Sequence, residues 1–292
     1  MIDREKMRVF DLHSHWGTRR GYRLRTDAER AQQPKVWKST ATYVTEQEMA
    51  GYFRKNRVKA ILDFGFTKSL PIDEVKEFHD YALETQRKYP DAIFGNWINI
   101  DPRSGTAGVA EVERCVAAKA GFVGFMVSGG SLGVAASDPV FDPFYGLCRE
   151  AKIPVLILVG YTGSGAGLPG GGGVRLELCH PRHVDDVAVR YPDLRIIAGR
   201  PAWPWQDEMI AVLLHKPNVW YELHGWSPKY HTESLKREIS RRLKDRVMFG
   251  ADYPLFTYER LFADWEAEGY SQEILGKVFC RNAESFFTGL GA

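Results

Sequence analysis

Cysteine is scarce in this sequence of 292 residues, which contains only four: Cys115, Cys148, Cys179 and Cys280. The four lie far apart and form no CxxC pair, which excludes a CxxC zinc or redox motif and gives no sign of a disulfide framework. A chain of this length can bury a large core without disulfides. We therefore expect reduced, mostly buried thiols in a cytoplasmic protein.

Long apolar runs and blocks of like charge are missing as well. No stretch approaches the ~20 apolar residues that span a bilayer, and the charged beginning MIDREKMRVFDLHSH lacks the apolar segment of a signal peptide. The net charge is only +2, and the basic residues form no cluster. These absences argue against nucleic-acid or membrane partners, so the expected ligand is a small molecule.

What the sequence does contain is a regular alternation of two kinds of segment. Short, continuous apolar runs are typical of strands buried on both faces, and stretches with helical spacing lie between them. The expected strands are Arg8–Phe10, Val58–Phe66, Ile93–Ile100, Gly121–Val127, Pro154–Val159, Arg195–Ala198, Val219–Leu223 and Val247–Phe249. The expected helices include Ile72–Arg87, Ala107–Lys119, Pro143–Ala151, Val184–Tyr191, Asp207–Leu214, Ser234–Leu243 and Glu259–Glu268. This α/β pattern predicts a (β/α)8 TIM barrel over residues 1–292 as a single domain, with an open doubly wound sheet as the competing architecture.

A glycine-rich segment, TGSGAGLPGGGG (Thr162–Gly173), follows the fifth expected strand. It contains a formal GxGxxG match, but Pro169 and further glycines follow instead of a helix that could point its N-terminus at a pyrophosphate. We therefore do not interpret it as a dinucleotide site. Glycine lets a backbone pass close to a ligand, and the position of the segment after a strand predicts a loop at the barrel mouth, with a plain surface loop as the alternative.

The pattern Asp11-Leu12-His13-Ser14-His15 carries the strongest chemical signal and directly follows the first apolar run. Alternate residues of a strand share a face, so Asp11, His13 and His15 are expected to point the same way. Two such imidazoles can bind one ion, and an adjacent carboxylate can hold the tautomer of a ligand histidine. An HxH pair alone is a weak signal, but this one lies at a C-terminal strand end, where barrel active sites are found.

The last expected strand leads straight into Gly250-Ala251-Asp252-Tyr253-Pro254. In a closed barrel the first and last strands are neighbours, which would place Asp252 beside His13 and His15. Two histidines and one carboxylate make a three-ligand site that leaves positions open for water or substrate. We therefore predict a mononuclear metal site on His13, His15 and Asp252.

On these and further motifs the chain resembles the amidohydrolase-related group that includes the aminocarboxymuconate-semialdehyde and γ-resorcylate decarboxylases. The resemblance implies a TIM barrel with His13, His15 and Asp252 as metal ligands, and with Asp252 as acceptor of a proton from metal-bound water. It extends from Asp11 to about Phe287 and rests on DLHSH (Asp11–His15), IPVLILVG (Ile153–Gly160), YPDLRIIAGRPAWPW (Tyr191–Trp205), NVWYELHGWSPKY (Asn218–Tyr230), RVMFGADYP (Arg246–Pro254) and RNAESFF (Arg281–Phe287).

The sequence departs from the pattern of this group at two positions. Relatives end the fifth strand with a ligand histidine where this chain has Leu158, and they carry a histidine after the sixth strand where it has Arg200. Leucine cannot ligate a metal, and a permanently charged guanidinium repels a divalent cation. We therefore expect one ion or none. Arg200 is expected either to pair with Asp252 in place of an ion or to hold a substrate carboxylate in a bidentate contact.

His224 ends the seventh expected strand and is our candidate general acid or base, with a compensating metal ligand and a structural histidine as alternatives. Glu222, two residues earlier, could support it. The candidate substrate contacts are Arg200, Tyr161, Trp203 and Lys229, which all follow strand ends. The run Trp203-Pro204-Trp205 also fits packing or an oligomer contact.

Two functions of different class follow from the sequence. The first is a metal-dependent hydrolase or non-oxidative decarboxylase that acts on a small, anionic organic substrate. Its divalent ion would be zinc, with manganese or iron as alternatives, and oxygen chemistry is a further branch for the latter two. The second is a catalytically reduced subunit, without an ion, that pairs with an active homologous chain of a hydrolase, decarboxylase or amine-oxidising system. Because barrels of this family usually dimerise, the resemblance implies a homodimer or a hetero-oligomer.

Overall fold

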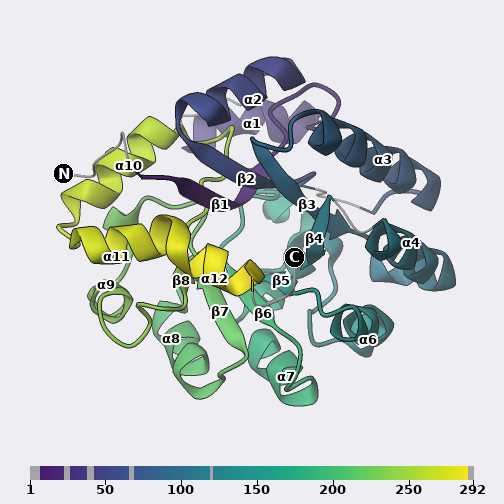
Figure 1. The fold of residues 1–292 in the computed structure, drawn as a ribbon. Coiled ribbons are helices and arrows are strands. Elements are labelled where there is room, and N and C mark those ends of the chain that lie inside the picture. Colours follow the sequence, from purple (N-terminus) through teal and green to yellow (C-terminus); the bar gives the residue numbers. More distant parts are fainter. Residues whose placement is uncertain (1–6, 23–26, 38–42, 66–68, 119–120, 289–292) are drawn as a thin grey trace.

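The computed structural model describes residues 7–22, 27–37, 43–65, 69–118 and 121–288. Within these residues eight parallel strands stand in sequence order, each hydrogen-bonded to the next. Figure 1 shows the strands in the centre and the helices around them. The strands are β1 (Val9–His15), β2 (Val58–Asp63), β3 (Ile93–Asn99), β4 (Phe122–Val127), β5 (Val155–Leu158), β6 (Ile196–Gly199), β7 (Val219–Glu222) and β8 (Val247–Met248).

Most helices lie between successive strands and cover the outside of the barrel, while the last three helices follow the eighth strand. The longest, α3 (Ile72–Lys88), begins with acidic residues and ends with basic ones, which complements the dipole of the helix. The others are α1 (Asp27–Trp37), α2 (Glu46–Lys55), α4 (Gly105–Ala117), α5 (Gly129–Leu132), α6 (Asp142–Glu150), α7 (Arg182–Arg190), α8 (Gln206–His215), α9 (Glu233–Ile239), α10 (Tyr258–Ala267), α11 (Gln272–Gly276) and α12 (Asn282–Thr288).

The first strand meets the segment that follows the last strand. The N–H of Leu12 donates to the carbonyl of Phe249 at 3.0 Å, and the N–H of Asp252 donates to the carbonyl of His13 at 2.9 Å. β1 therefore has β2 on one side and the end of β8 on the other. The sheet closes on itself as a TIM barrel, and the alternative of an open doubly wound sheet is wrong.

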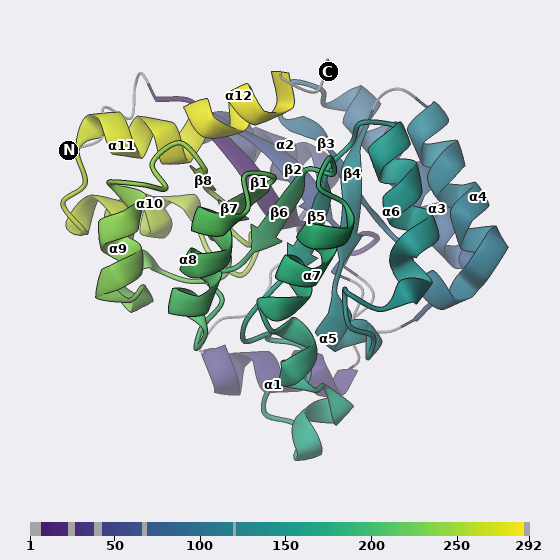
Figure 2. The ribbon, with the colours of Figure 1, turned by 90° about the horizontal axis from the view of Figure 1, so that it is seen from below.

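Apolar side chains fill the inside of the barrel. Leu12, Trp97 and Leu158 belong to this buried cluster, and Phe10 and Phe287 close it at one end. The rings of Phe10 and Phe287 are stacked, with centroids 5.5 Å apart. Figure 2 shows α12, which carries Phe287, lying across this end of the barrel, far from α1 and α5. The N-terminal ends of the strands are thus covered, and the C-terminal ends form the open mouth.

The structure confirms the eight expected strands, with ends that shift by a few residues. β1 is longer than expected because it continues through the histidine motif to His15. Phe66 and Lys119, each at the end of an expected element, lie outside the described residues. The four cysteines are buried and free. Among the described residues, no helix combines the length and the apolar character needed to cross a membrane.

Candidate active site at the barrel mouth

A cavity of about 310 Å³ opens at the C-terminal ends of the strands. This volume is at the lower end of the range for small-molecule sites. Strand residues contribute His13, His15, Asp63, Met126 and Leu158 to its lining, and the loops and short helical segments that follow the strands contribute most of the rest. The glycine-rich segment reaches the cavity through its first residues (162–164), so the prediction of a loop at the mouth is confirmed.

The strand β1 does not alternate regularly through the histidine motif. Its register against β2 shifts between Asp11 and Ser14, and Leu12, not Asp11, belongs to the cluster that fills the barrel. Because such an irregularity breaks the period of two, the expected common face of Asp11, His13 and His15 is wrong for Asp11. His13 and His15 both line the cavity.

Asp11 joins β1 to the segment after β8 and to α10. Its Oδ1 accepts the backbone N–H of His13 and that of Ala251, both at 3.0 Å. Its Oδ2 accepts the hydroxyl of Ser14 at 2.5 Å and that of Tyr258 at 2.7 Å. One buried carboxylate therefore holds the strand that carries His13 against the segment that leads to the mouth aspartate. It does not contact the imidazole as we expected.

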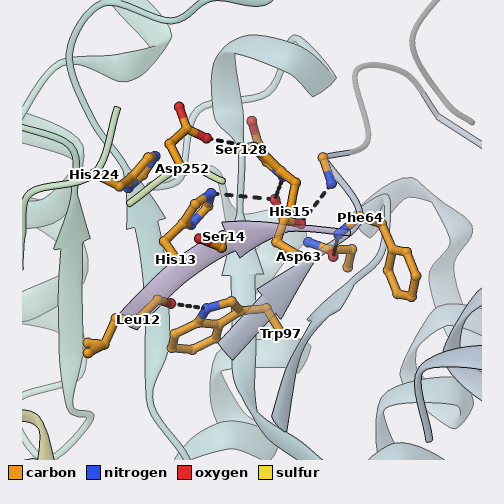
Figure 3. Close-up of polar contacts among 12 residues, drawn as sticks. Leu12, His13, Ser14, His15, Asp63, Phe64, Trp97, Ser128, His224 and Asp252 are labelled. Carbon is orange, nitrogen blue, oxygen red and sulfur yellow. Dashed lines mark hydrogen bonds and ion pairs between the residues drawn. The ribbon is translucent and has the colours of Figure 1, made fainter. Parts of the chain in front are cut away.

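The three predicted metal ligands come together at one side of the cavity (Figure 3). The Nε2 atom of His15 lies 2.9 Å from Oδ1 of Asp252. The rings of His13 and His15 are nearly perpendicular, at 87°, with centroids 5.1 Å apart. Both histidines are buried, with 1% and 7% of their surface exposed. The meeting of the first and last strands thus produces this grouping, while the ligand role of the three residues stays a prediction.

A second carboxylate, Asp63 at the end of β2, faces the same two histidines. Its Oδ2 lies 3.0 Å from Nδ1 of His15 and 3.6 Å from Nε2 of His13. The side chain is buried. We did not predict this residue from the sequence, although a lone carboxylate within the expected apolar strand was the available signal.

Two groups of mouth residues bring potential ligand atoms within 4.8 Å of one another: His13, His15 and Asp63, and His13, His224 and Asp252. In the second group the rings of His13 and His224 are stacked, with centroids 3.7 Å apart and planes 6° apart. A metal bound to an imidazole nitrogen lies close to the plane of the ring. An ion in the plane of one stacked ring lies a full stacking distance outside the plane of the other. In this orientation, the two rings do not share an ion.

His224 is held by Glu222 at the end of β7, whose Oε2 lies 2.5 Å from Nδ1 of the imidazole. Burial and the nearby Asp11 raise the pKa of Glu222 well above its usual range, and burial and His13 lower the pKa of His224. Both shifts favour the uncharged form of the side chain. Gly250 makes room for the contact between Glu222 and His224, since a Cβ at position 250 would lie 1.8 Å from Oε1 of Glu222.

Arg200 follows β6 and enters the cavity as a buried guanidinium, 8% exposed. Its Nη1 donates to the carbonyl of Tyr161 at 3.1 Å, while its Nε has no hydrogen-bond partner among the described residues. Burial lowers the pKa of Arg200, and Cys179 and Asp252 oppose that shift. Leu158, at the end of β5, presents an apolar surface to the same cavity.

Aromatic side chains also line the cavity. Tyr161 lines the cavity and packs against Trp203 and Trp226, with centroids 6.1 Å away in each case. Trp226 also lines the cavity but was not among our candidates. Trp203 is 45% exposed, and the Nζ of Lys229 lies 5.0 Å from the ring centre of Tyr230. Within the described part of the chain, Trp203 and Lys229 lie outside the cavity lining.

The charges around the two histidines favour a cation. Burial lowers the pKa of His13 to about 4, although Asp63 acts in the opposite direction. Burial would also lower the pKa of His15, but Asp252 and Asp63 together raise it well above its usual range. The space between the two carboxylates therefore favours positive charge, as a proton on His15 or as a metal ion. The donor set of neutral imidazoles and carboxylates fits a divalent ion such as zinc or manganese.

A third group of potential ligands, His79, Glu111 and Cys115, lies on α3 and α4, away from the mouth. The Nδ1 atom of His79 lies 2.6 Å from Oε1 of Glu111, and its Nε2 accepts the N–H of Asn99 at 3.4 Å. Arg114 donates to both oxygens of Glu111. Because these polar groups satisfy one another, the cluster is explained by packing.

Comparison with known proteins agrees with this geometry. A family model described as Amidohydrolase matches residues 15–288, while no curated protein matches the sequence. A TIM-barrel protein of uncharacterized function from Bordetella bronchiseptica is 16% identical, with a TM-score of 0.73 over 98% of this chain and 100% of its own. The 5-carboxyvanillate decarboxylase of Novosphingobium aromaticivorans, complexed with manganese and 4-hydroxy-3-methoxy-5-nitrobenzoic acid, is 18% identical, with a TM-score of 0.71 over 97% of each chain.

A dihydroxybenzoic acid decarboxylase from Polaromonas sp. JS666, with bound manganese and the inhibitor 2-nitroresorcinol, is 17% identical, with a TM-score of 0.68 over 97% of each chain. At these identities the solved structures show a shared fold alone. The family model, in contrast, spans nearly the whole chain, including His15 and Asp252. The resemblance noted from the motifs is therefore confirmed, and the chain belongs to the amidohydrolase family.

Proposed function

We propose that the protein is a metal-dependent enzyme with one divalent ion at the barrel mouth, acting as a hydrolase or a non-oxidative decarboxylase on a small, anionic organic substrate. One observation carries the proposal. Two buried imidazoles and two carboxylates converge on a cavity that also holds a buried guanidinium with an unpartnered Nε. Convergent polar groups in the main cavity of a TIM barrel are typical of an active site.

His13 and His15 would hold the ion together with a carboxylate, for which the sequence predicts Asp252. The lowered pKa of His13 supports this role, because a neutral imidazole offers its lone pair at physiological pH. When bound, a divalent ion activates water or polarises a carboxylate. We put zinc first from the donor set; manganese, which the two decarboxylases described above contain, and iron are the alternatives.

Arg200 would bind the anionic group of the substrate. A buried guanidinium is costly unless it is paired, and the described structure gives its Nε no partner. A substrate carboxylate in the cavity could accept a hydrogen bond from Nε of the guanidinium. Tyr161 and Trp226, which line the cavity, would pack against the body of the substrate. Trp203 and Lys229, which lie outside the lining, would contact any part of the substrate that extends outward.

His224 is the candidate acid or base, and Asp252 is the second. The stacking of His224 on His13 favours this role over that of a compensating ligand. The contact with Glu222 occupies Nδ1 and so directs the chemistry of the ring to Nε2. Asp252 lies near His224 on the segment after β8 and lines the cavity, where it can accept a proton from water.

Elemental analysis of purified protein tests the proposal. We expect about one divalent ion per chain, lost in His13→Ala and retained in His215→Ala, a control at an exposed position on α8. Metal-loaded protein should then release carbon dioxide from an aromatic acid, or hydrolyse an ester or amide, and His13→Ala should not. Protein that takes up no ion when supplied with zinc, manganese or iron would contradict the proposal.

The second candidate is a catalytically reduced subunit of a hetero-oligomer. Leu158 and Arg200 favour it, since an apolar group and a cation occupy mouth positions where the motif resemblance implies histidines. Co-purification of an ion-free chain with a homologous chain that retains both histidines would support this alternative. We place either form, homodimer or hetero-oligomer, in the cytoplasm, because the buried cysteines are free.

A further inference from the structure

We infer that Asp63, rather than Asp252, supplies the carboxylate ligand of the ion, together with Nε2 of His13 and Nδ1 of His15. This inference rests on the proposed function and assigns its metal site to the β1–β2 side of the mouth. Asp252 would then lie outside the coordination shell, in contact with the other nitrogen of His15.

One carboxylate oxygen of Asp63 lies close to a nitrogen of each histidine. Oδ2 of Asp63 lies 3.0 Å from Nδ1 of His15 and 3.6 Å from Nε2 of His13. Bonds of ~2.1 Å to a common ion, at tetrahedral or octahedral angles, separate neighbouring ligand atoms by roughly 3.0–3.4 Å. The rings of His13 and His15 are nearly perpendicular. Their planes therefore intersect, and both can contain the same ion, unlike the stacked planes of His13 and His224.

A hydrogen bond between His15 and Asp63 is lacking where one would otherwise be expected. Nδ1 of His15 and Oδ2 of Asp63 are both buried, and within the described structure neither has a hydrogen-bond partner, although they lie close together. An imidazole N–H that served only to bond Asp63 would point at that oxygen. Two potential ligand atoms 3.0 Å apart without such a bond have the spacing that an ion bound to both would give.

The carboxylate of Asp63 is held in place by the turn that follows it. Its Oδ1 accepts the N–H of Gly65 at 2.9 Å, which fixes the carboxylate and leaves Oδ2 toward the histidines. Gly65 has a φ of +63°, and a Cβ there would lie 3.0 Å from Nδ1 of His15. A glycine at this turn thus allows the backbone to fold closely around the proposed ligand atoms.

In this arrangement Asp252 has a different role from that of a metal ligand. Nε2 of His15 lies 2.9 Å from Oδ1 of Asp252, on the far side of the ring from Asp63. With Nδ1 directed to the ion, Nε2 carries the proton and can donate to Asp252. Such a carboxylate–histidine contact orients the ligand ring, and it leaves Asp252 at the cavity surface as a proton acceptor.

Cobalt substitution with a cysteine at each carboxylate position tests the assignment directly. A thiolate bonded to Co²⁺ gives a charge-transfer band in the near ultraviolet, and an unbound thiolate does not. We expect the band in Co²⁺-loaded Asp63→Cys, and none in the wild type or in Asp252→Cys. No band in Asp63→Cys, or a band in Asp252→Cys, overturns the inference. A wild type that takes up no cobalt would instead contradict the proposed function.

A milder pair of variants covers the case in which the cysteine variant does not fold. Asp63→Asn should weaken Co²⁺ binding, measured by titration calorimetry, by more than a hundredfold and change the visible spectrum of the bound ion. Residues that only orient a ligand typically change affinity by about 10–100-fold. Asp252→Asn should fall in that lower range with an unchanged spectrum. The reverse ranking would show that Asp252 is the ligand.

Discussion

Four hydrogen bonds to the carboxylate of Asp11 tie β1 to the segment after β8 and to α10. Removing one of these donors should therefore lower the stability of the protein. Tyr258→Phe deletes a buried donor to Oδ2 of Asp11, which lies 2.7 Å away, and leaves three donors on the carboxylate. A hydrogen bond to a charged group contributes about 1.5–3 kcal/mol, and a bond between neutral groups about 1 kcal/mol. Burial raises the pKa of Asp11 to about 6, although its four donors oppose this shift.

The sign of the pH dependence follows from that value. Because the folded pKa of Asp11 lies above its usual value of 3.8, the native state holds the neutral acid below about pH 6 and the carboxylate above it. Tyr258→Phe should therefore lower the free energy of unfolding by about 2 kcal/mol at about pH 8 and by about 1 kcal/mol at about pH 5. Urea denaturation followed by circular dichroism measures both.

Tyr145→Phe is the matched control. Tyr145 is as fully buried as Tyr258, but its hydroxyl donates to a neutral backbone carbonyl, that of Ala136, at 2.6 Å. We expect a loss of about 1 kcal/mol at both pH values. A Tyr258→Phe cost that is equal at both pH values, or larger in acid, would refute the role of Asp11 as a buried carboxylate that ties β1 to the last strand.

Three further outcomes follow from the structure. His231 is buried with no hydrogen-bond partner for either ring nitrogen among the described residues, and burial lowers its pKa to about 3. Because the unfolded chain binds this proton at a higher pH than the native state does, the free energy of unfolding should fall as the pH drops below 6.5. In His231→Phe this loss should be smaller by about 2 kcal/mol at about pH 5, measured by urea denaturation. Gly160 has a φ of +73° and a Cβ there would lie 2.5 Å from Cα of Ala202, so Gly160→Ala should lower the melting temperature in calorimetry by several degrees, whereas Gly146→Ala, where a Cβ meets open space, should not. Arg200→Met should weaken binding of benzoate by about 2–4 kcal/mol in calorimetry and leave binding of uncharged benzamide nearly unchanged; equal losses for both ligands would contradict its role as an anion anchor.

The barrel itself could be predicted because its strands are buried on both faces. Continuous apolar runs such as those of β2 and β5 read as parallel strands without any knowledge of their partners. The meeting of His15 with Asp252 followed from closure alone, since the first and last strands of a barrel must be neighbours. The first prediction needs only the apolar runs, and the second needs only the places of the two motifs, at the ends of the first and last strands.

Features that depend on contacts between distant residues could not be predicted. The irregularity in β1 turns Asp11 away from the cavity and toward Tyr258, and no local pattern marks it. Asp63 is one polar residue at the end of an apolar run, and its position beside His15 becomes visible only when β2 lies against β1. The orientation of His224 is set by Glu222, which has room only because residue 250 is glycine.

The central claim is that the barrel mouth binds one divalent ion between His13 and His15. Anomalous diffraction from a crystal grown with manganese tests it most directly. We predict a single strong peak per chain, within bonding distance of a nitrogen of each of these two histidines. A mouth without a peak, or a peak bound only to residues elsewhere in the chain, would contradict the account.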